Sequence, residues 1–251
     1  MSEDRGASPG PGEAVRNELV GRQLDERIVA RFPLGKRLRV LDVGMGRGAQ
    51  ALRLARGGHE VTGVEQDADA LAAVRAVVAA EPEGIRSRMR VVEGDARDTG
   101  VHFLPGSFDV VLCHGGLMHV DEPDALLAGL GRVLAPGGLL SLVVRNADAL
   151  AMRPGLRADW AGALAAFGSD TYRDESGAEV RAHRLDAVGQ SLAGIAAPLV
   201  AWYGVRVFSE ATDIPAAGPD LEALLSAETR AGRTDPYRRV ATMLHLCGGR
   251  D

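Results

Sequence analysis

The stretch "LRVLDVGMGRGAQALRLA", residues 38–55, decides the fold of this chain. Its apolar run ends in a glycine-rich turn and continues in a helical pattern, which is how many proteins hold a nucleotide. Further apolar runs, separated by helical patterns, follow at 59–65, 89–96, 108–114, 139–146, 199–209 and 238–248. Strands this apolar, alternating with helices, predict an α/β fold in which helices cover both faces of a largely parallel sheet of seven strands.

The chain outside these runs divides into a lead, a helix and an insertion. The lead, "MSEDRGASPGPGE" at 1–13, is rich in Gly, Pro, Ser and charge, and we expect it to be disordered. Residues 13–32 have helical spacing. Residues 147–183 lack a clear strand and are expected to form an insertion over the carboxyl edge of the sheet, on the substrate side. We therefore expect a single domain over 14–251.

The composition limits the surroundings and partners of the protein. The chain has 251 residues, 46% of them apolar, and a formal charge of -5. It therefore lacks the long-range positive field of general nucleic-acid binders, so any contact with nucleic acid should be local. No apolar run approaches the about 18 residues that a membrane span requires. We expect a cytoplasmic protein with no membrane association and no metal site.

The glycine turn does not follow the pattern of a dinucleotide-binding turn. Gly44, Gly46 and Gly48 are spaced G-x-G-x-G, and Asp42 precedes them at the end of the strand; we expect all four residues to line the ligand site. In the dinucleotide fingerprint the spacing is G-x-G-x-x-G, so the third glycine is misplaced for a pyrophosphate. A dinucleotide stays open as an alternative on this motif alone.

Two acids follow the next two strands and favour an adenosine ligand. Glu65 closes the second strand, where a carboxylate can accept hydrogen bonds from both ribose hydroxyls, although an ordinary turn acid is the alternative. Asp95 follows the third strand, within reach of an adenine amino group. Because the ends of parallel strands meet at one edge of a sheet, we expect these groups to line one crevice.

The order and spacing of five segments resemble the class I S-adenosylmethionine-dependent methyltransferases. They are "LDVGMGRG", "VEQD", "EGDA", "FDVVLCHGGLMHV" and "LAPGGLLSLVV", within residues 38–146. The resemblance implies a Rossmann-like sheet of seven strands whose last strand is antiparallel, and S-adenosyl-L-methionine as the cofactor. This ligand has no phosphate, so the glycines need only let the backbone approach it, while its sulfonium favours carboxylates and its own carboxylate favours a cation.

A second set of segments is similar to the bacterial tRNA 5-carboxymethoxyuridine methyltransferases, which esterify the carboxylate of a modified wobble uridine. They are "RNELVGRQLD", "RNADAL", "YGVRVFSEATD" and "LEALLSAETRAGRTDPYRRVATMLHL". The resemblance implies a role in tRNA modification, with tRNA as partner. It implies cofactor contacts from Arg16, Gly44, Met45, Glu65, Ala96, Arg97 and His114. The insertion does not follow the enterobacterial pattern and lacks its lysine-rich run.

A carboxylate acceptor places particular demands on the site. It is already ionised at neutral pH, so it needs orientation rather than a general base, and arginine orients carboxylates through paired hydrogen bonds. Arg145 and Arg206 flank the insertion and are our candidates for this role. Tyr203 could stack on a base, and Arg230 belongs to an arginine cluster that could meet an anticodon-loop backbone, with a salt-bridged surface as the alternative. His114 is either structural or a base.

Two other functions stay open from the sequence. A small-molecule O- or N-methyltransferase should have an enclosed apolar pocket under the insertion. A subunit that binds S-adenosylmethionine without catalysis is the other, and the intact glycine turn and Glu65 argue against it.

Overall fold

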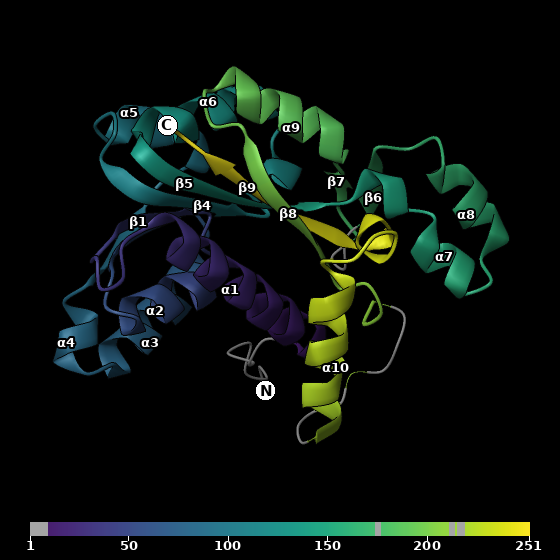
Figure 1. Cartoon of the computed structure of the whole chain (residues 1–251), viewed down its shortest axis with the longest axis horizontal. Coiled ribbons are helices and arrows are strands. Elements are labelled where there is room, and N and C mark those ends of the chain that lie inside the picture. Colours follow the sequence, from purple (N-terminus) through teal and green to yellow (C-terminus); the bar gives the residue numbers. More distant parts are fainter. Residues whose placement is uncertain (1–9, 174–176, 211–213, 215–218) are drawn as a thin grey trace.

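The computed structural model of the protein describes residues 10–173, 177–210, 214 and 219–251. Seven strands form one sheet in the order β3-β2-β1-β4-β5-β9-β8 (Figure 1). They are β1 (Arg39–Val43), β2 (Glu60–Glu65), β3 (Met89–Glu93), β4 (Phe108–His114), β5 (Leu134–Arg145), β8 (Leu199–Val205) and β9 (Met243–Gly249). The first five strands pair in parallel, and β9 is antiparallel to both β5 and β8. The predicted sheet and its antiparallel last strand are therefore confirmed.

Helices cover both faces of the sheet, as the alternation of strands and helical patterns predicted. Figure 1 shows α1, α2 and α3 below the sheet and α6 and α9 above it. The helices are α1 (Pro11–Arg31), α2 (Ala49–Arg56), α3 (Ala68–Ala80), α4 (Glu83–Arg86), α5 (Thr99–His102), α6 (Pro123–Val133), α7 (Met152–Leu156), α8 (Trp160–Ala166), α9 (Leu185–Gly194) and α10 (Pro219–Ala231).

The central strand β4 shows why the sheet is covered on both sides. Val110 and Leu112 pack in the apolar cluster that contains residues of α1, α2 and α3, whereas Val111 and Cys113 pack in the cluster that contains residues of α6 and α9. All of these residues are 0% exposed. Successive side chains of a strand point to opposite faces, so an uninterrupted apolar run requires an apolar layer on each side.

The first helix begins earlier than we predicted. We expected disorder through residue 13, but α1 begins at Pro11, after Gly10 as its N-cap. Proline is favoured in the first turn of a helix because an N–H group at that position would have no acceptor within the helix. Glu13 lies in the same turn, where its negative charge is stabilised by the positive end of the helix dipole. The rest of the predicted disordered lead, residues 1–9, lies outside the described residues.

The insertion contains more regular structure than its sequence indicated. Residues 147–183 hold α7, α8 and an antiparallel pair of strands, β6 (Thr171–Arg173) and β7 (Glu179–Arg181). The sequence showed no strand here because each strand has three residues and only Val180 is buried, so no periodic apolar pattern can develop. Figure 1 shows α7 and α8 beyond the end of the main sheet, beside β6.

The third glycine of the turn should be required for packing rather than for ligand approach. Gly48 has φ +75°, and a Cβ there would lie 2.6 Å from Val74 Cγ2, whereas Gly46 has φ +56° and open space around it. We expect Gly48→Ala to lower the free energy of unfolding by about 2–4 kcal/mol, and Gly46→Ala by only about 1–2 kcal/mol. Both alanines would be strained at positive φ, but only the one at position 48 would also clash with Val74. Urea unfolding of both variants measures the difference, and equal losses would contradict it.

Candidate functional site

A cavity opens at the carboxyl ends of β1, β2 and β4, where parallel sheets bind their ligands. We call it the strand-end cavity. It has a volume of about 440 Å³, which is within the range of small-ligand sites. It is lined by Arg16, Gly44, Glu65, Gln66, Gly94, Asp95, Ala96, Arg97, His114, Gly115, Gly116, Met118, His119 and Val120. The structure therefore brings together seven of the residues predicted from sequence to bind the cofactor: Arg16, Gly44, Glu65, Asp95, Ala96, Arg97 and His114.

The glycine turn forms one wall of the strand-end cavity. Gly44 and Gly46 have φ +65° and +56°, and a Cβ at either position would project into open space. The turn is held to the next strand because the backbone N–H groups of Gly44 and Met45 donate to the Val64 carbonyl, at 2.9 and 3.1 Å. The Met45 side chain points the other way, into the core beneath Gly63. Of the turn, only Gly44 lines the cavity; Met45 and Gly46, which we expected to contact the ligand, do not.

Glu65 connects the turn after β1 to the start of α3. One carboxylate oxygen accepts from the Gly46 N–H at 2.7 Å, and the other accepts from the N–H groups of Gln66 and Asp67, both at 2.9 Å. A carboxylate offers about four acceptor positions. Glu65 thus retains acceptor capacity for a ligand hydroxyl while its position is set by the backbone.

Asp42 lies behind the turn and does not line the cavity. Its side chain is 3% exposed, and burial, with a further contribution from the charge of Glu65, raises its pKa to about 7. Gly48 is likewise remote, because it caps α2 against Val74. These two residues, which the sequence analysis assigned to cofactor binding, occupy supporting positions in the structure.

Asp95 and Arg97 form a pair on the far wall of the cavity. The backbone N–H of Arg97 donates to Asp95 at 2.8 Å, and its Nε lies 2.9 and 3.0 Å from the two carboxylate oxygens. These hydrogen bonds from Arg97, first through its side chain, lower the pKa of Asp95. The carboxylate of Asp95 is therefore ionised and held at the rim, where it can accept a hydrogen bond from an amino group.

His114 ends β4 at the floor of the cavity. Its Nε2 lies 2.8 Å from the hydroxyl of Ser141 on β5, and its ring meets the ring of His245 edge to face at 5.8 Å. Burial, followed by the nearby His245 and Arg16, holds the pKa of His114 well below its ordinary value. His114 is therefore a neutral imidazole at physiological pH.

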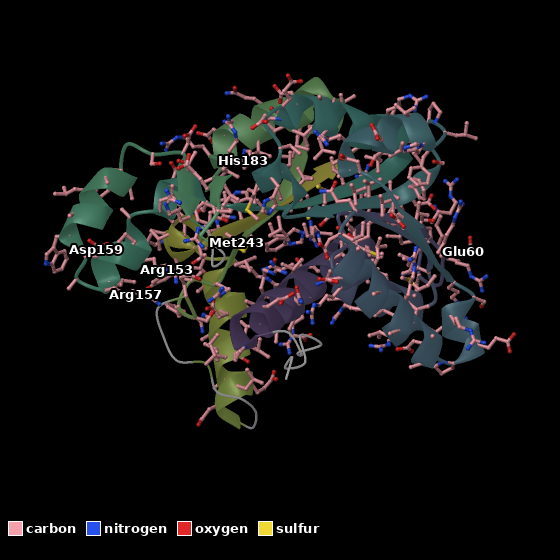
Figure 2. The ribbon with its side chains drawn as sticks, turned by 180° about the vertical axis from the view of Figure 1, so that it is seen from behind. Glu60, Arg153, Arg157, Asp159, His183 and Met243 are labelled. Carbon is pink, nitrogen blue, oxygen red and sulfur yellow. The ribbon has the colours of Figure 1, made fainter. Side chains whose placement is uncertain are left out.

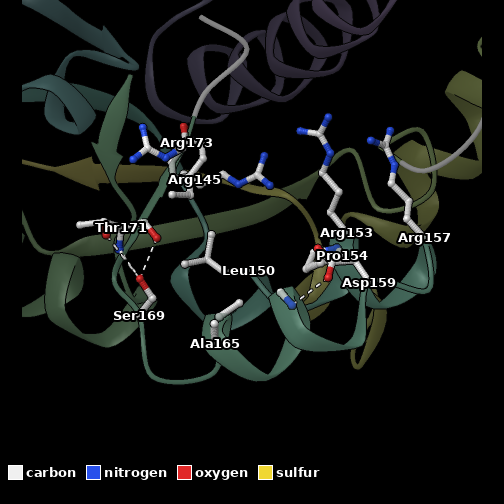
Figure 3. A pocket seen from close by; sticks show the side chains of 13 residues that line it. Arg145, Leu150, Arg153, Pro154, Arg157, Asp159, Ala165, Ser169, Thr171 and Arg173 are labelled. Carbon is white, nitrogen blue, oxygen red and sulfur yellow. Dashed lines mark hydrogen bonds between the residues drawn. The ribbon is translucent and has the colours of Figure 1, made fainter. Parts of the chain in front are cut away.

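Two further cavities continue from the first and are lined by arginine. The connecting cavity shares Arg16 with the strand-end cavity and also contains Arg206, Glu210 and Met243. Figure 2 shows Arg153 and Arg157 of the insertion close to Met243, and both arginines line the connecting cavity. The insertion cavity, about 720 Å³, lies between α7, α8 and β6. Figure 3 shows the side chains of Arg145, Arg153, Arg157 and Arg173 extending to one side of it.

Glu210 joins three arginines where these cavities meet. Its carboxylate lies 3.4 Å from Arg145, 3.4 Å from Arg153 and 3.0 Å from Arg206. Arg145 also packs over the ring of Tyr172, with its guanidinium carbon 4.8 Å from the ring centre. Arg206 adopts φ +60°, a strained conformation for a residue other than glycine. We name Arg145, Arg153, Arg206 and Glu210 the arginine clasp.

The structure places the other two substrate candidates away from the cavities. Tyr203 is 5% exposed, and its hydroxyl donates to Glu26 of α1 at 3.1 Å, so it cannot stack on a base. Arg230 is exposed at the end of α10 and lines none of the three cavities. Its neighbours Arg238 and Arg239 pair with Asp235, as expected for a salt-bridged surface.

Sequence reasoning missed Arg153, Arg157 and Glu210. Arg153 and Arg157 are four residues apart around α7, so they lie on one side of the helix, a spacing that was visible in the sequence. Glu210 gave a weaker signal: Arg206 is only four residues away, but its other two partners, Arg145 and Arg153, are distant along the chain.

Within the described ranges, no group of three or more His, Cys, Asp or Glu side chains is arranged to hold a metal ion. Among the helices described, none has the length and apolar character needed to cross a membrane.

Comparisons with known proteins identify the family of this chain. The family profile for a methyltransferase domain matches residues 41–142. The tRNA 5-carboxymethoxyuridine methyltransferase of Escherichia coli K12 is 31% identical over 238 residues, covering 92% of this chain and 87% of that protein. The ubiquinone biosynthesis O-methyltransferase of Paracidovorax citrulli is 38% identical over 115 residues, covering 44% and 46%.

Solved structures share the fold. An S-adenosylmethionine-dependent methyltransferase from Mesorhizobium loti superposes with a TM-score of 0.61 at 19% identity, covering 90% of this chain and 96% of that one. A glycopeptide N-methyltransferase complexed with S-adenosyl-L-homocysteine gives 0.58 at 17% identity, covering 93% and 89%.

Glu65 provides a direct test of the cofactor assignment. Replacing Glu65 by Ala should weaken S-adenosylmethionine binding at least about tenfold, because ribose hydroxyls would lose a charged acceptor. Glu93→Ala is a matched control, since Glu93 ends the adjacent strand opposite Glu65 but does not line the cavity. Titration calorimetry measures both affinities, and circular dichroism verifies the fold. Unchanged affinity in Glu65→Ala would exclude the ribose contact.

Proposed function

Because this chain belongs to the class I S-adenosylmethionine-dependent methyltransferases, we propose that it methylates a carboxylate of tRNA, the carboxymethoxy group of a modified wobble uridine. The methyltransferase activity and the cofactor, S-adenosyl-L-methionine, follow from the family. The choice of acceptor is the proposal. It is carried by the arginine clasp, which holds a carboxylate beside the strand-end cavity.

The residues of the strand-end cavity fit the cofactor. The open space at Gly44 and Gly46 lets the backbone approach a ligand, and Glu65 can accept from ribose hydroxyls. Arg16 also lines the cavity and supplies a cation for the cofactor's own carboxylate. S-adenosylmethionine supplies a methyl group bound to a cationic sulfur, and the chain has to align the acceptor with that methyl group.

The arginine clasp is suited to hold such an acceptor. Arg145 and Arg206 are largely buried, with side chains 12% and 17% exposed, and they share one internal carboxylate, that of Glu210. The Nε atoms of both arginines are buried without a hydrogen-bond partner among the described residues. A second anion would balance the excess positive charge of three arginines that share one carboxylate. The local chemistry therefore favours an anionic acceptor.

A carboxylate acceptor would make a general base unnecessary. Carboxylates ionise well below neutral pH, so the methyl transfer needs no residue to remove a proton. The histidine at the cavity floor, His114, has a lowered pKa, which makes it a poor proton acceptor. Orientation by arginine is then the contribution that the chain makes to the acceptor.

The similarity to the Escherichia coli enzyme supports tRNA as the molecule that carries the carboxylate, because it extends over 92% of this chain. A small-molecule acceptor is the second candidate. It is favoured by the volume of the insertion cavity, about 720 Å³, which is within the range of small-ligand sites.

The assay for the proposed function uses methyl-labelled S-adenosylmethionine and bulk tRNA from a host strain that lacks this gene. We expect label to enter tRNA and to be released by mild alkali, because a methyl ester hydrolyses under these conditions. Label that resists alkali would indicate methylation at nitrogen or an ether and would contradict the carboxylate. Absence of label with normal cofactor binding would contradict tRNA and favour a small molecule.

The arginine clasp can be tested separately from the cofactor. We expect Arg145→Gln and Arg206→Gln to lower kcat/KM for the acceptor by about tenfold to a hundredfold, because each removes a charged hydrogen bond to a carboxylate. Affinity for S-adenosylmethionine should stay within about twofold of wild type. Arg239→Gln is the matched control, because Arg239 is 65% exposed and pairs with Asp235. If kcat/KM falls equally in Arg145→Gln, Arg206→Gln and Arg239→Gln, the arginine clasp does not bind the acceptor.

A further inference from the structure

We propose that a buried hydrogen-bond chain, Gln23–His245–Ser141–His114, fixes the tautomer of His114, so that its Nδ1 is an unprotonated acceptor for the ammonium group of the cofactor. The chain runs from α1 through β9 and β5 to the end of β4. Gln23, Ser141 and His245 are thereby positioning residues. The inference does not depend on the identity of the methyl acceptor.

The direction of the chain is set at Gln23. This side chain is 2% exposed, and its Nε2 donates to the Gly204 carbonyl at 3.4 Å. Its Oε1 lies 2.8 Å from His245 Nδ1. The opposite amide orientation would set the Gln23 oxygen against the Gly204 carbonyl, and two acceptors cannot share a hydrogen bond. His245 Nδ1 must therefore carry a proton and donate it to Gln23.

The proton on Nδ1 determines the state of the other nitrogen of His245. The ring is 0% exposed, and burial lowers its pKa to about 3, so it is neutral and Nε2 is an acceptor. Ser141 Oγ lies 2.8 Å from this nitrogen and is its strongest available donor. The Cys247 thiol, at 3.5 Å, approaches the same nitrogen and is also a donor. Both contacts agree with an unprotonated Nε2.

Ser141 transmits this direction to His114. A hydroxyl has one proton, and Ser141 uses it toward His245, so its oxygen must accept from His114 Nε2 at 2.8 Å. Burial keeps His114 neutral. With the single ring proton on Nε2, Nδ1 retains its lone pair.

The resulting acceptor suits the ligand of the strand-end cavity. The ring of His114 lines this cavity, and its Nδ1 has no hydrogen-bond partner among residues 10–173, 177–210, 214 and 219–251. S-adenosylmethionine carries positive charge on its sulfonium and its ammonium group, and of these two cations only the ammonium can donate hydrogen bonds. The opposite tautomer would direct an N–H at this cation, and a protonated ring would repel it. The buried chain excludes both.

The test is nitrogen NMR of the full-length protein with isotope-labelled histidine, at neutral pH and without acceptor. We expect His114 to be protonated on Nε2 alone and His245 on Nδ1 alone, with assignments from His114→Gln and His245→Gln. A proton on Nδ1 of His114 in the wild type would overturn the inference.

Gln23→Met provides the remote perturbation, because Gln23 does not line the cavity. We expect His114 to populate both tautomers and cofactor affinity by calorimetry to fall about three- to tenfold. Gln50→Met is the matched control: Gln50 is also buried and donates to α1, at Asn17 O (2.7 Å), but stands outside the chain. It should leave the His114 tautomer unchanged.

Ser141→Ala breaks the chain next to His114 and serves if Gln23→Met does not fold. We expect the same mixture of tautomers and the same loss of affinity. A single Nε2-protonated tautomer in whichever variant folds would show that the chain does not control His114, and would overturn the inference. Because no acceptor is present, this result is independent of whether tRNA is methylated.

Discussion

The carboxylate of Glu65 is the contact on which the site depends. It accepts hydrogen bonds from three backbone N–H groups, one in the turn after β1 and two at the start of α3. It therefore joins two segments that are adjacent because β1 and β2 pair in parallel. A charged acceptor near the beginning of a helix is stabilised by the helix dipole. The same contacts hold the carboxylate at the cavity edge, so the arrangement that supports the fold also prepares the ligand site.

Charge is distributed locally rather than over the whole molecule. The chain is acidic overall, with a formal charge of -5, yet arginines line three cavities that follow one another from the strand ends to the insertion. Burial strengthens their interaction with an anion because the surroundings screen charge less than water does. Glu210 neutralises part of this charge in the arginine clasp and shows that the position accepts a carboxylate.

Helix α1 contributes residues both to the ligand cavity and to the buried chain that ends at His114. It carries Arg16, which lines the strand-end cavity and the connecting cavity, and Gln23, which begins the buried chain to His114. These residues are seven positions apart, about two helical turns, so they lie on one side of α1. The placement of α1 against β5 and β8 therefore sets a charge at the cavity wall and the state of the histidine at its floor.

The sequence alone determined the alternation of strands and helices, the glycine turn and the acid after each of the next two strands, because these depend on local periodicity and on residue types at strand ends. The resemblance of its motifs also indicated the antiparallel last strand. Only the tertiary structure decided which of these residues reach the cavity. Asp42 and Tyr203 have suitable chemistry but are buried and do not line the cavity. The strands of the insertion are too short for a periodic signal. Arg145 and Glu210 of the arginine clasp, and the residues of the His114 chain, are far apart in sequence, and such pairings arise only when packing brings distant segments together.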